Sequence, residues 1–229
     1  MIAEAEKLEC KYCKKEFRRI SSLTVHMCES KRRWQQEKDT GVRFGLQAYV
    51  KFYETMSAGN KDKSYAGFVS SPYYSAFVKF GQYIVSIQAV NPTAFIEWII
   101  KSNKKLDSWC SDRNYDEYLL QYLRHENPQD ALERALKEME KWAEENNSVF
   151  NHFFLFGNEN KICQMINNGR ISPWVIFNCD SGTAMLGKLN TSQLDIIYSI
   201  IDPDFWNRKL ETYASDASWV KDILNQAGL

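Results

Sequence analysis

The feature that most constrains this chain is a set of metal-ligating residue types near its N-terminus. Cys10 and Cys13 are separated by two residues. Twelve residues then lie between Cys13 and His26, and Cys28 follows two positions later. A tetrahedral Zn²⁺ site takes four nitrogen or sulfur ligands, and a C-x2-C pair supplies two thiolates from one tight turn. A module this small buries little apolar surface, so the metal must supply most of its folding free energy. We therefore predict a Zn²⁺ site formed by Cys10, Cys13, His26 and Cys28.

The apolar residues between the ligands also follow a regular spacing. Phe17 stands four residues after the second cysteine. Leu23 follows six residues later, and His26 three residues after that. In these intervals residues 8–28 resemble the C2H2 zinc-finger family, and the resemblance implies a small zinc-binding module with one short helix.

The fourth ligand departs from the pattern of that family. This sequence has Ser-Lys-Arg at positions 30–32, where the family has its second histidine. Cys28 is the available substitute, which makes the module a C2HC variant. Residues i and i+2 point to different sides of a helix, so we expect the helix to be distorted or to end around Met27. The alternative interpretation is that these cysteines are unrelated and simply buried.

Charge is distributed unevenly along the chain. The 229 residues carry 29 basic and 29 acidic side chains, and residues 1–63 hold 14 of the basic but only 9 of the acidic ones. A basic segment on a zinc module is the expected footprint for phosphate contacts, whereas charged runs elsewhere usually form ordinary solvated surface. The residues that we predict to bind nucleic acid are Lys14, Lys15, Arg18, Arg19, Lys31, Arg32 and Arg33.

The cysteine usage favours the reducing cytoplasm. The three cysteines outside the predicted zinc site, Cys110, Cys163 and Cys179, are scattered rather than arranged as a disulfide framework. No apolar run approaches the roughly 18 residues of a membrane span, so we expect no membrane partner.

The rest of the chain follows a helical pattern. Apolar residues recur at intervals of three and four, most clearly through residues 128–146. Residues 61–69 are predicted to form a loop, and residues 82–90 are the one place where a strand is compatible with the sequence. Helix starts are predicted where a polar residue precedes proline, at residues 71–72, 91–92, 127–128, 172–173 and 202–203.

These patterns predict a mainly α protein in which a small N-terminal zinc-binding module is followed by an all-α helical domain. The predicted division is a zinc-finger module at residues 1–30, a basic linker and helix at 31–57, and an α-helical domain at 58–229.

No catalytic site is predicted. A hydrolytic metal site needs clustered carboxylates, and Asp112, Asp202 and Asp204 stand where helix caps and first-turn acids are expected. His125 and His152 have no cysteine or carboxylate at ligand spacing.

Two further stretches resemble phage proteins. Residues 171–182 (ISPWVIFNCDSG) and 201–210 (IDPDFWNRKL) are similar to stretches of uncharacterised proteins of large T-even-like tailed phages. The helical part is also similar to the all-α helicase-loading proteins of those phages, which have no zinc module. The resemblance implies a role in phage DNA metabolism, in the cytoplasm of the host.

Together these features predict a non-enzymatic accessory protein that binds nucleic acid, with DNA favoured over RNA, and recruits a partner such as a polymerase or replication component. In the finger docking mode the base-reading positions are Arg19, Ser22 and Val25. Only Arg19 has a strong base partner, so binding should be largely electrostatic and salt-dependent. The alternatives are a protein–protein adaptor or structural protein whose zinc module is a docking element and, less favoured, a helicase-loader-like protein or a metal-dependent nuclease.

Overall fold

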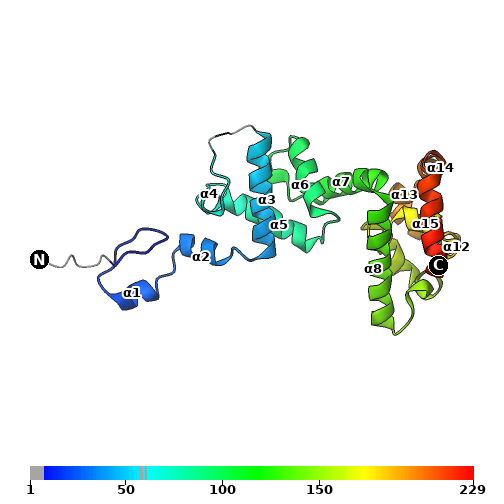
Figure 1. Ribbon diagram of the computed structural model, residues 1–229, viewed down its shortest axis with the longest axis horizontal. Coiled ribbons are helices and arrows are strands. Elements are labelled where there is room, and N and C mark those ends of the chain that lie inside the picture. The colour runs from blue at the N-terminus through cyan, green and yellow to red at the C-terminus, as the bar shows by residue number, and fades with distance from the viewer. Residues whose placement is uncertain (1–7, 57–58, 60) are drawn as a thin grey trace, which may run out of the picture. The chain divides into compact units, whose positions relative to one another are not determined.

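The computed structural model of the chain describes residues 8–56, 59 and 61–229. These residues form α-helices and two short 3-10 helices, and none of them is in a β-strand, so the predicted mainly α fold is confirmed (Figure 1). No helix in the described part of the chain has the length and the apolar character that crossing a membrane requires.

The chain forms two compact units, residues 1–114 and residues 115–229. The predicted domain boundary between residues 57 and 58 lies outside the described residues. The first unit contains α1 (Ile20–Thr24), α2 (Glu29–Gln35), α3 (Thr40–Thr55), α4 (Tyr65–Val69), α5 (Tyr74–Ser86), α6 (Pro92–Lys101) and η1 (Leu106–Ser108). The second contains most of α7 (Asp112–His125), then α8 (Pro128–Asn146), η2 (Phe150–His152), α9 (Phe153–Phe156), α10 (Glu159–Asn167), α11 (Pro173–Phe177), α12 (Asp180–Leu186), α13 (Thr191–Ile201), α14 (Pro203–Thr212) and α15 (Ala214–Gln226).

Polar caps followed by proline begin four helices, as the sequence predicts. The side chains of Asn91, Asn127, Ser172 and Asp202 each accept a backbone N–H from the first turn of α6, α8, α11 and α14, respectively. Proline follows each cap at the first helical position, where its missing N–H breaks no hydrogen bond. Asp202 therefore stands at a helix cap, the position in which the sequence predicts an acidic side chain.

The prediction that residues 61–69 form a loop is wrong for the second half of this segment. Tyr65–Val69 form α4, and Ser64 caps this helix by accepting the N–H of Gly67. Phe68 and Val69 are buried in the first unit. Tertiary packing therefore stabilises a helix that is too short to persist on its own propensity.

The run 82–90 is helical as far as Ser86 and contains no strand. The buried residues of α5 include Phe77, Phe80, Gly81 and Ile84, at the spacing of one helix face. This helix begins at Tyr74, later than the Ser-Pro signal predicts. The Ser71 side chain instead accepts the N–H of Tyr73 in the turn before α5.

The first unit is built on a close crossing of α3 over α5 (Figure 1). Glycines allow the two backbones to approach. A Cβ on Gly81 would lie 1.9 Å from the carbonyl oxygen of Gly41, and a Cβ on Gly45 would lie 2.8 Å from the carbonyl oxygen of Phe77. Aromatic side chains fill the space beside the crossing. The ring of Phe77 lies 5.6 Å from Tyr49, and the Phe80 ring lies 5.0 Å from Trp109.

The second unit has its own apolar core. α8 buries Leu132, Ala135 and Met139 on one face, as the helical spacing of residues 128–146 predicts. α10 packs against α13, and α11 packs against α8 and α15. The indole rings of Trp174 and Trp206 meet in this core, with their centroids 5.9 Å apart.

Candidate metal centre

The first ligand pair lies on a tight hairpin. Glu9 and Glu16 form an antiparallel bridge across it, and the N–H of Cys10 donates to the carbonyl of Lys15 at 2.9 Å. The N–H of Lys14 donates to the carbonyl of Cys10 at 2.8 Å and closes the turn. Lys14 has a φ of 61°, in the left-handed region that such tight turns use. The backbone therefore folds the C-x2-C pair into one knuckle.

The second ligand pair lies between two helices. α1 ends at Thr24, α2 begins at Glu29, and residues 25–28 are not helical. This break removes the constraint that would point His26 and Cys28 to different sides of one helix. The expected end of the helix around Met27 is confirmed.

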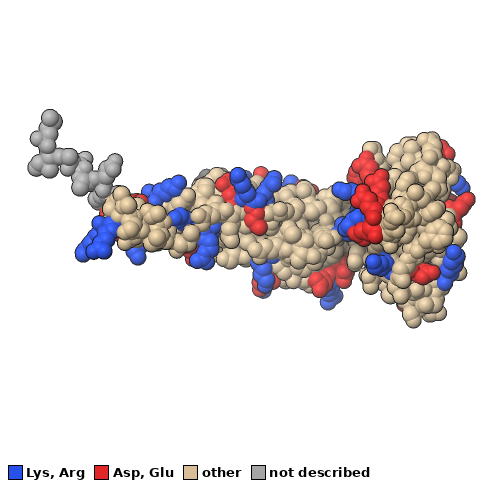
Figure 2. All heavy atoms as spheres, turned by 90° about the horizontal axis from the view of Figure 1, so that it is seen from below, with Lys and Arg blue, Asp and Glu red and all other residues tan. Residues whose placement is uncertain are grey.

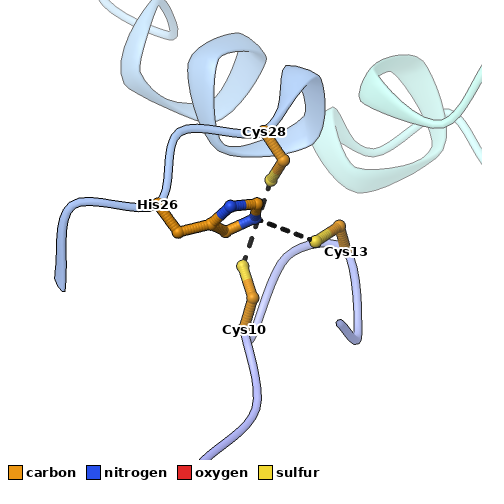
Figure 3. A group of neighbouring side chains, drawn as sticks. All are labelled: Cys10, Cys13, His26 and Cys28. Carbon is orange, nitrogen blue, oxygen red and sulfur yellow. Dashed lines mark hydrogen bonds between the residues drawn. The ribbon is translucent and has the colours of Figure 1, made fainter. Parts of the chain in front are cut away.

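The four predicted ligands converge. One sulfur or nitrogen atom of each residue lies within 4.8 Å of the corresponding atoms of the other three. The Sγ of Cys10 lies 3.9 Å from the Sγ of Cys28, and the Sγ of Cys13 lies 3.3 Å from the Nε2 of His26. Figure 3 shows the two hairpin cysteines and the two residues of the connection pointing toward a common centre. This arrangement could hold a metal ion.

The backbone around the cluster favours negative charge on sulfur. The N–H of Lys31 donates to the Sγ of Cys28 at 3.3 Å, and Cys28 caps the N-terminus of α2, where the helix dipole stabilises an anion. The pKa of the Cys10 thiol is lowered to about 7, mainly by a hydrogen bond from the backbone N–H of Cys13, whereas burial acts in the opposite direction. The N–H of Lys15 lowers the pKa of Cys13, but burial and the neighbouring thiols of Cys28 and Cys10 outweigh it and leave that pKa raised.

Aromatic contacts attach the metal cluster to the helical part of the first unit. Trp34 of α2 contacts Tyr12 of the hairpin on one side, with ring centroids 6.3 Å apart, and Tyr65 of α4 on the other, at 5.1 Å. The Tyr65 hydroxyl donates to the carbonyl of Arg33 at 2.6 Å. The hairpin, α2 and α4 are therefore joined through one aromatic chain.

Arg33 strengthens the same junction. Its Nη1 donates to the carbonyl of Val69 at 2.7 Å, its guanidinium lies 4.4 Å from the ring centroid of Tyr74, and it also pairs with Glu29. Only 21% of the Arg33 side chain is exposed. No spacing in the sequence indicates this role, because the partners belong to α4, which is predicted as a loop, and to α5.

The predicted nucleic-acid-binding residues fall into two groups. Lys31 and Arg33 are partly buried, and the Nζ of Lys31 donates to the carbonyl of His26 at 3.1 Å. The other five, Lys14, Lys15, Arg18, Arg19 and Arg32, are exposed. Basic side chains gather at the end of the first unit that carries the four candidate metal ligands (Figure 2).

The predicted base-reading positions are also accessible. Arg19, Ser22 and Val25 are exposed, although α1 has only five residues. Three apolar side chains of the module are exposed as well: Ile20 at 69%, Val25 at 80% and Met27 at 51%. The surface around α1 is therefore both basic and apolar.

In the part of the chain that the structure describes, no other group of three or more histidine, cysteine, aspartate or glutamate side chains converges in this way. Asp112 lies in the first turn of α7, as predicted for a helix-start acid. No known family, curated protein or solved structure matches this chain. Its function must therefore be inferred from its own geometry.

Proposed function

We propose that this chain is a zinc-dependent accessory protein that binds nucleic acid through its N-terminal module without catalysing a reaction. The observation that carries the proposal is the group of five exposed basic side chains beside a closed cluster of four metal-ligating residues. The helical units would then engage a protein partner, such as a polymerase or a replication component of a phage.

Zinc fits the cluster better than other common metals. Three cysteines and one histidine are the ligand types of structural zinc sites, in which no coordination position is left for substrate. Zn–S bonds of about 2.3 Å and Zn–N bonds of about 2.0 Å place tetrahedral ligands about 3.8 Å apart for two sulfurs and about 3.5 Å apart for sulfur and nitrogen. Two of the corresponding distances here are 3.9 Å for Cys10 and Cys28 and 3.3 Å for Cys13 and His26, each within a few tenths of an ångström of that geometry, and all four ligand atoms lie within 4.8 Å of one another.

The charge of the module predicts the salt dependence of binding. Each phosphate that a basic side chain neutralises on duplex DNA contributes about −0.9 to the slope of log affinity against log salt. If Lys14, Lys15, Arg18, Arg19 and Arg32 each contact a phosphate, the slope should reach roughly −4 to −5. Arg33 would contribute through the placement of the module, because its guanidinium is engaged within the first unit.

The test is a salt titration of DNA and RNA binding by the zinc-loaded full chain. The double variant Arg18→Ser, Arg19→Ser should reduce the magnitude of the slope by about 1.8, the value for two lost phosphate contacts. Lys137→Ser with Lys141→Ser, two exposed lysines of α8, is the matched control and should leave the slope unchanged. Absence of binding at about 50 mM salt, or an unchanged slope in the Arg18 and Arg19 variant, would refute the proposal.

A protein–protein adaptor is the second candidate, and the exposed apolar side chains of the module favour it. Ile20, Val25 and Met27 together would give a small apolar contact surface of the kind that partner proteins cover. If Ile20→Ser with Val25→Ser abolishes capture of a phage or host replication protein while nucleic-acid binding is weak in every variant, the adaptor function replaces the first proposal.

A further inference from the structure

A hollow of about 720 Å³ lies in the second unit, separate from the metal cluster. It is formed by the end of α7, the start of α8, α11, α14 and the start of α15. Sites for small ligands in proteins commonly have volumes of about 300–1,000 Å³. Residues 171–182 and 201–210 both contribute to its lining, although about twenty residues separate them in the chain.

Aromatic rings form one side of this hollow. Trp174 and Phe205 line it, and Trp206 lies behind them, with ring centroids 5.9 Å from Trp174 and 5.5 Å from Phe205. Tyr213 adds a more exposed ring at the rim. Of these rings, the partly exposed Phe205 and the exposed Tyr213 offer surfaces against which a planar ring can stack, whereas Trp174 and Trp206 are buried.

Cationic side chains lie against these rings. The guanidinium of Arg124 lies 4.6 Å from the ring centroid of Phe205, and the Nζ of Lys209 lies 5.0 Å from that of Trp174. Lys209 also donates to the carbonyl of Arg124, and burial lowers its pKa. Arg208, the third cation of the lining, is exposed.

The acidic groups nearby are largely neutralised. The carboxylate of Glu126 is fully buried, with Arg134 at 2.6 Å and the hydroxyl of Ser172 at 2.7 Å on its two oxygens. Asp202 caps α14, and its carboxylate also forms an ion pair with Arg124, with 3.4 Å between Oδ2 and Nη2. Asp216 lies in the first turn of α15, where the helix dipole offsets its charge. The positive character of the lining therefore remains available to a ligand.

Two buried hydrogen-bond donors of the lining have no acceptor within the described part of the chain. They are the Nε of Arg124 and the indole Nε1 of Trp174. Trp174 is 1% exposed, so water has little access to its side chain. A buried donor without an acceptor is unfavourable. Both atoms are covered by neighbouring side chains, so a ligand with several acceptor oxygens would remove the deficit once those side chains move aside. α15 also begins beside the hollow, at Ala214, and its N-cap residue Tyr213 makes no side-chain cap hydrogen bond.

From this combination of adjacent aromatic rings, cations and unsatisfied donors, we propose that the hollow is a binding site for a nucleotide. The base would stack on Phe205 and Tyr213, and the phosphate would accept from Arg124 and Arg208 and, once its covering side chains move aside, from the indole of Trp174. The nucleotide is either a free molecule or one unit of a nucleic-acid strand, since both present the same phosphate and base. The site does not depend on zinc or on the basic residues of the N-terminal module.

The test uses the zinc-loaded full chain labelled with ¹⁵N and follows the indole N–H signals during titration with AMP. Trp174→Phe identifies the signal of Trp174. AMP should move this signal downfield, as expected for an N–H that gains an acceptor, and should bind roughly tenfold more tightly than either adenosine or inorganic phosphate. Arg208→Gln should weaken AMP binding roughly tenfold, the loss of one charge-assisted hydrogen bond, while Lys221→Gln, an exposed lysine of α15 outside the hollow, should not.

Other results would overturn the proposal. A Trp174 indole signal that stays in place up to about 5 mM AMP would show that no nucleotide enters. Equal affinity for AMP and phosphate would indicate a simple anion site, and unchanged AMP affinity in Arg208→Gln would place binding elsewhere. If the site binds AMP, a short single-stranded oligonucleotide identifies the source: tighter binding by the strand at the Trp174 signal indicates nucleic acid, and weaker binding indicates a free nucleotide.

Discussion

Gly81→Ala should separate the packing of the first unit from the chemistry of its metal cluster. The added Cβ would lie 1.9 Å from the carbonyl oxygen of Gly41 and 2.6 Å from the backbone nitrogen of Gly45. Real Cβ atoms essentially never approach a neighbour within 3.0 Å, and both of these atoms belong to the backbone of α3. The clash therefore cannot be relieved by rotating a side chain, and α3 must move about 1 Å away from α5.

The energetic cost follows from that displacement. A gap of about 0.5–1 Å forfeits a quarter to a half of the dispersion energy of each contact it opens, and overpacking of a core typically costs about 1–3 kcal/mol or more. Replacing glycine within a helix returns up to about 1 kcal/mol of helix propensity. We expect a net loss of roughly 2–3 kcal/mol, because the displacement affects the largest helix–helix contact of the unit.

The assay is urea unfolding followed by circular dichroism and by NMR signals of each unit separately. Gly187→Ala is the control, because Gly187 has a φ of −66° and its nearest added-Cβ neighbour lies at 3.5 Å. That variant should be neutral or slightly stabilising. The metal affinity of Gly81→Ala should stay unchanged, since all four ligands lie in residues 10–28. A loss of less than about 0.5 kcal/mol in Gly81→Ala would refute the close α3–α5 crossing.

Three further variants test the metal cluster and the buried polar contacts. If the cluster binds zinc as proposed, Cys28→Ser and Cys28→Ala should both lower the zinc content measured by elemental analysis. Only the alanine variant should also lose the cap of α2, worth about 1 kcal/mol in thermal unfolding. Arg33→Met should lower the free energy of unfolding by about 1.5–3 kcal/mol, because its charged hydrogen bonds are lost. The control Arg32→Met, at an exposed position, should change that free energy by less than about 0.5 kcal/mol. Similar values for the two variants would contradict the structural role of Arg33. Glu126→Gln should destabilise the second unit by about 3 kcal/mol, because it leaves the guanidinium of Arg134 without its carboxylate. An unchanged midpoint of urea unfolding would show that this buried pair contributes no net stability.

Much of the fold and of the metal cluster could be predicted because the causes are local. The cysteine and histidine ligands are recognised by residue type and spacing, and the end of the helix before Cys28 follows from the geometry of residues two positions apart. The starts of α6, α8, α11 and α14 follow from polar caps and prolines that act within one turn.

The failures occur where local preference is weak. Residues 61–69 have no strong helical pattern, and α4 forms because Phe68 and Val69 are buried by distant parts of the chain. Residues 82–86 are compatible with a strand in isolation, but the face that includes Gly81 and Ile84 packs on α3 and keeps them helical.

The sequence by itself determined which side chains can bind a metal, because thiolate and imidazole ligands at that spacing have few other uses. Only the tertiary structure decided which basic side chains remain open to solvent, since Arg33 is engaged by Val69 and Tyr74, more than thirty positions away. The tertiary structure also brings Arg124 and Lys209 together with Trp174 in the second unit. Contacts over such separations depend on how helices pack, which no local spacing encodes.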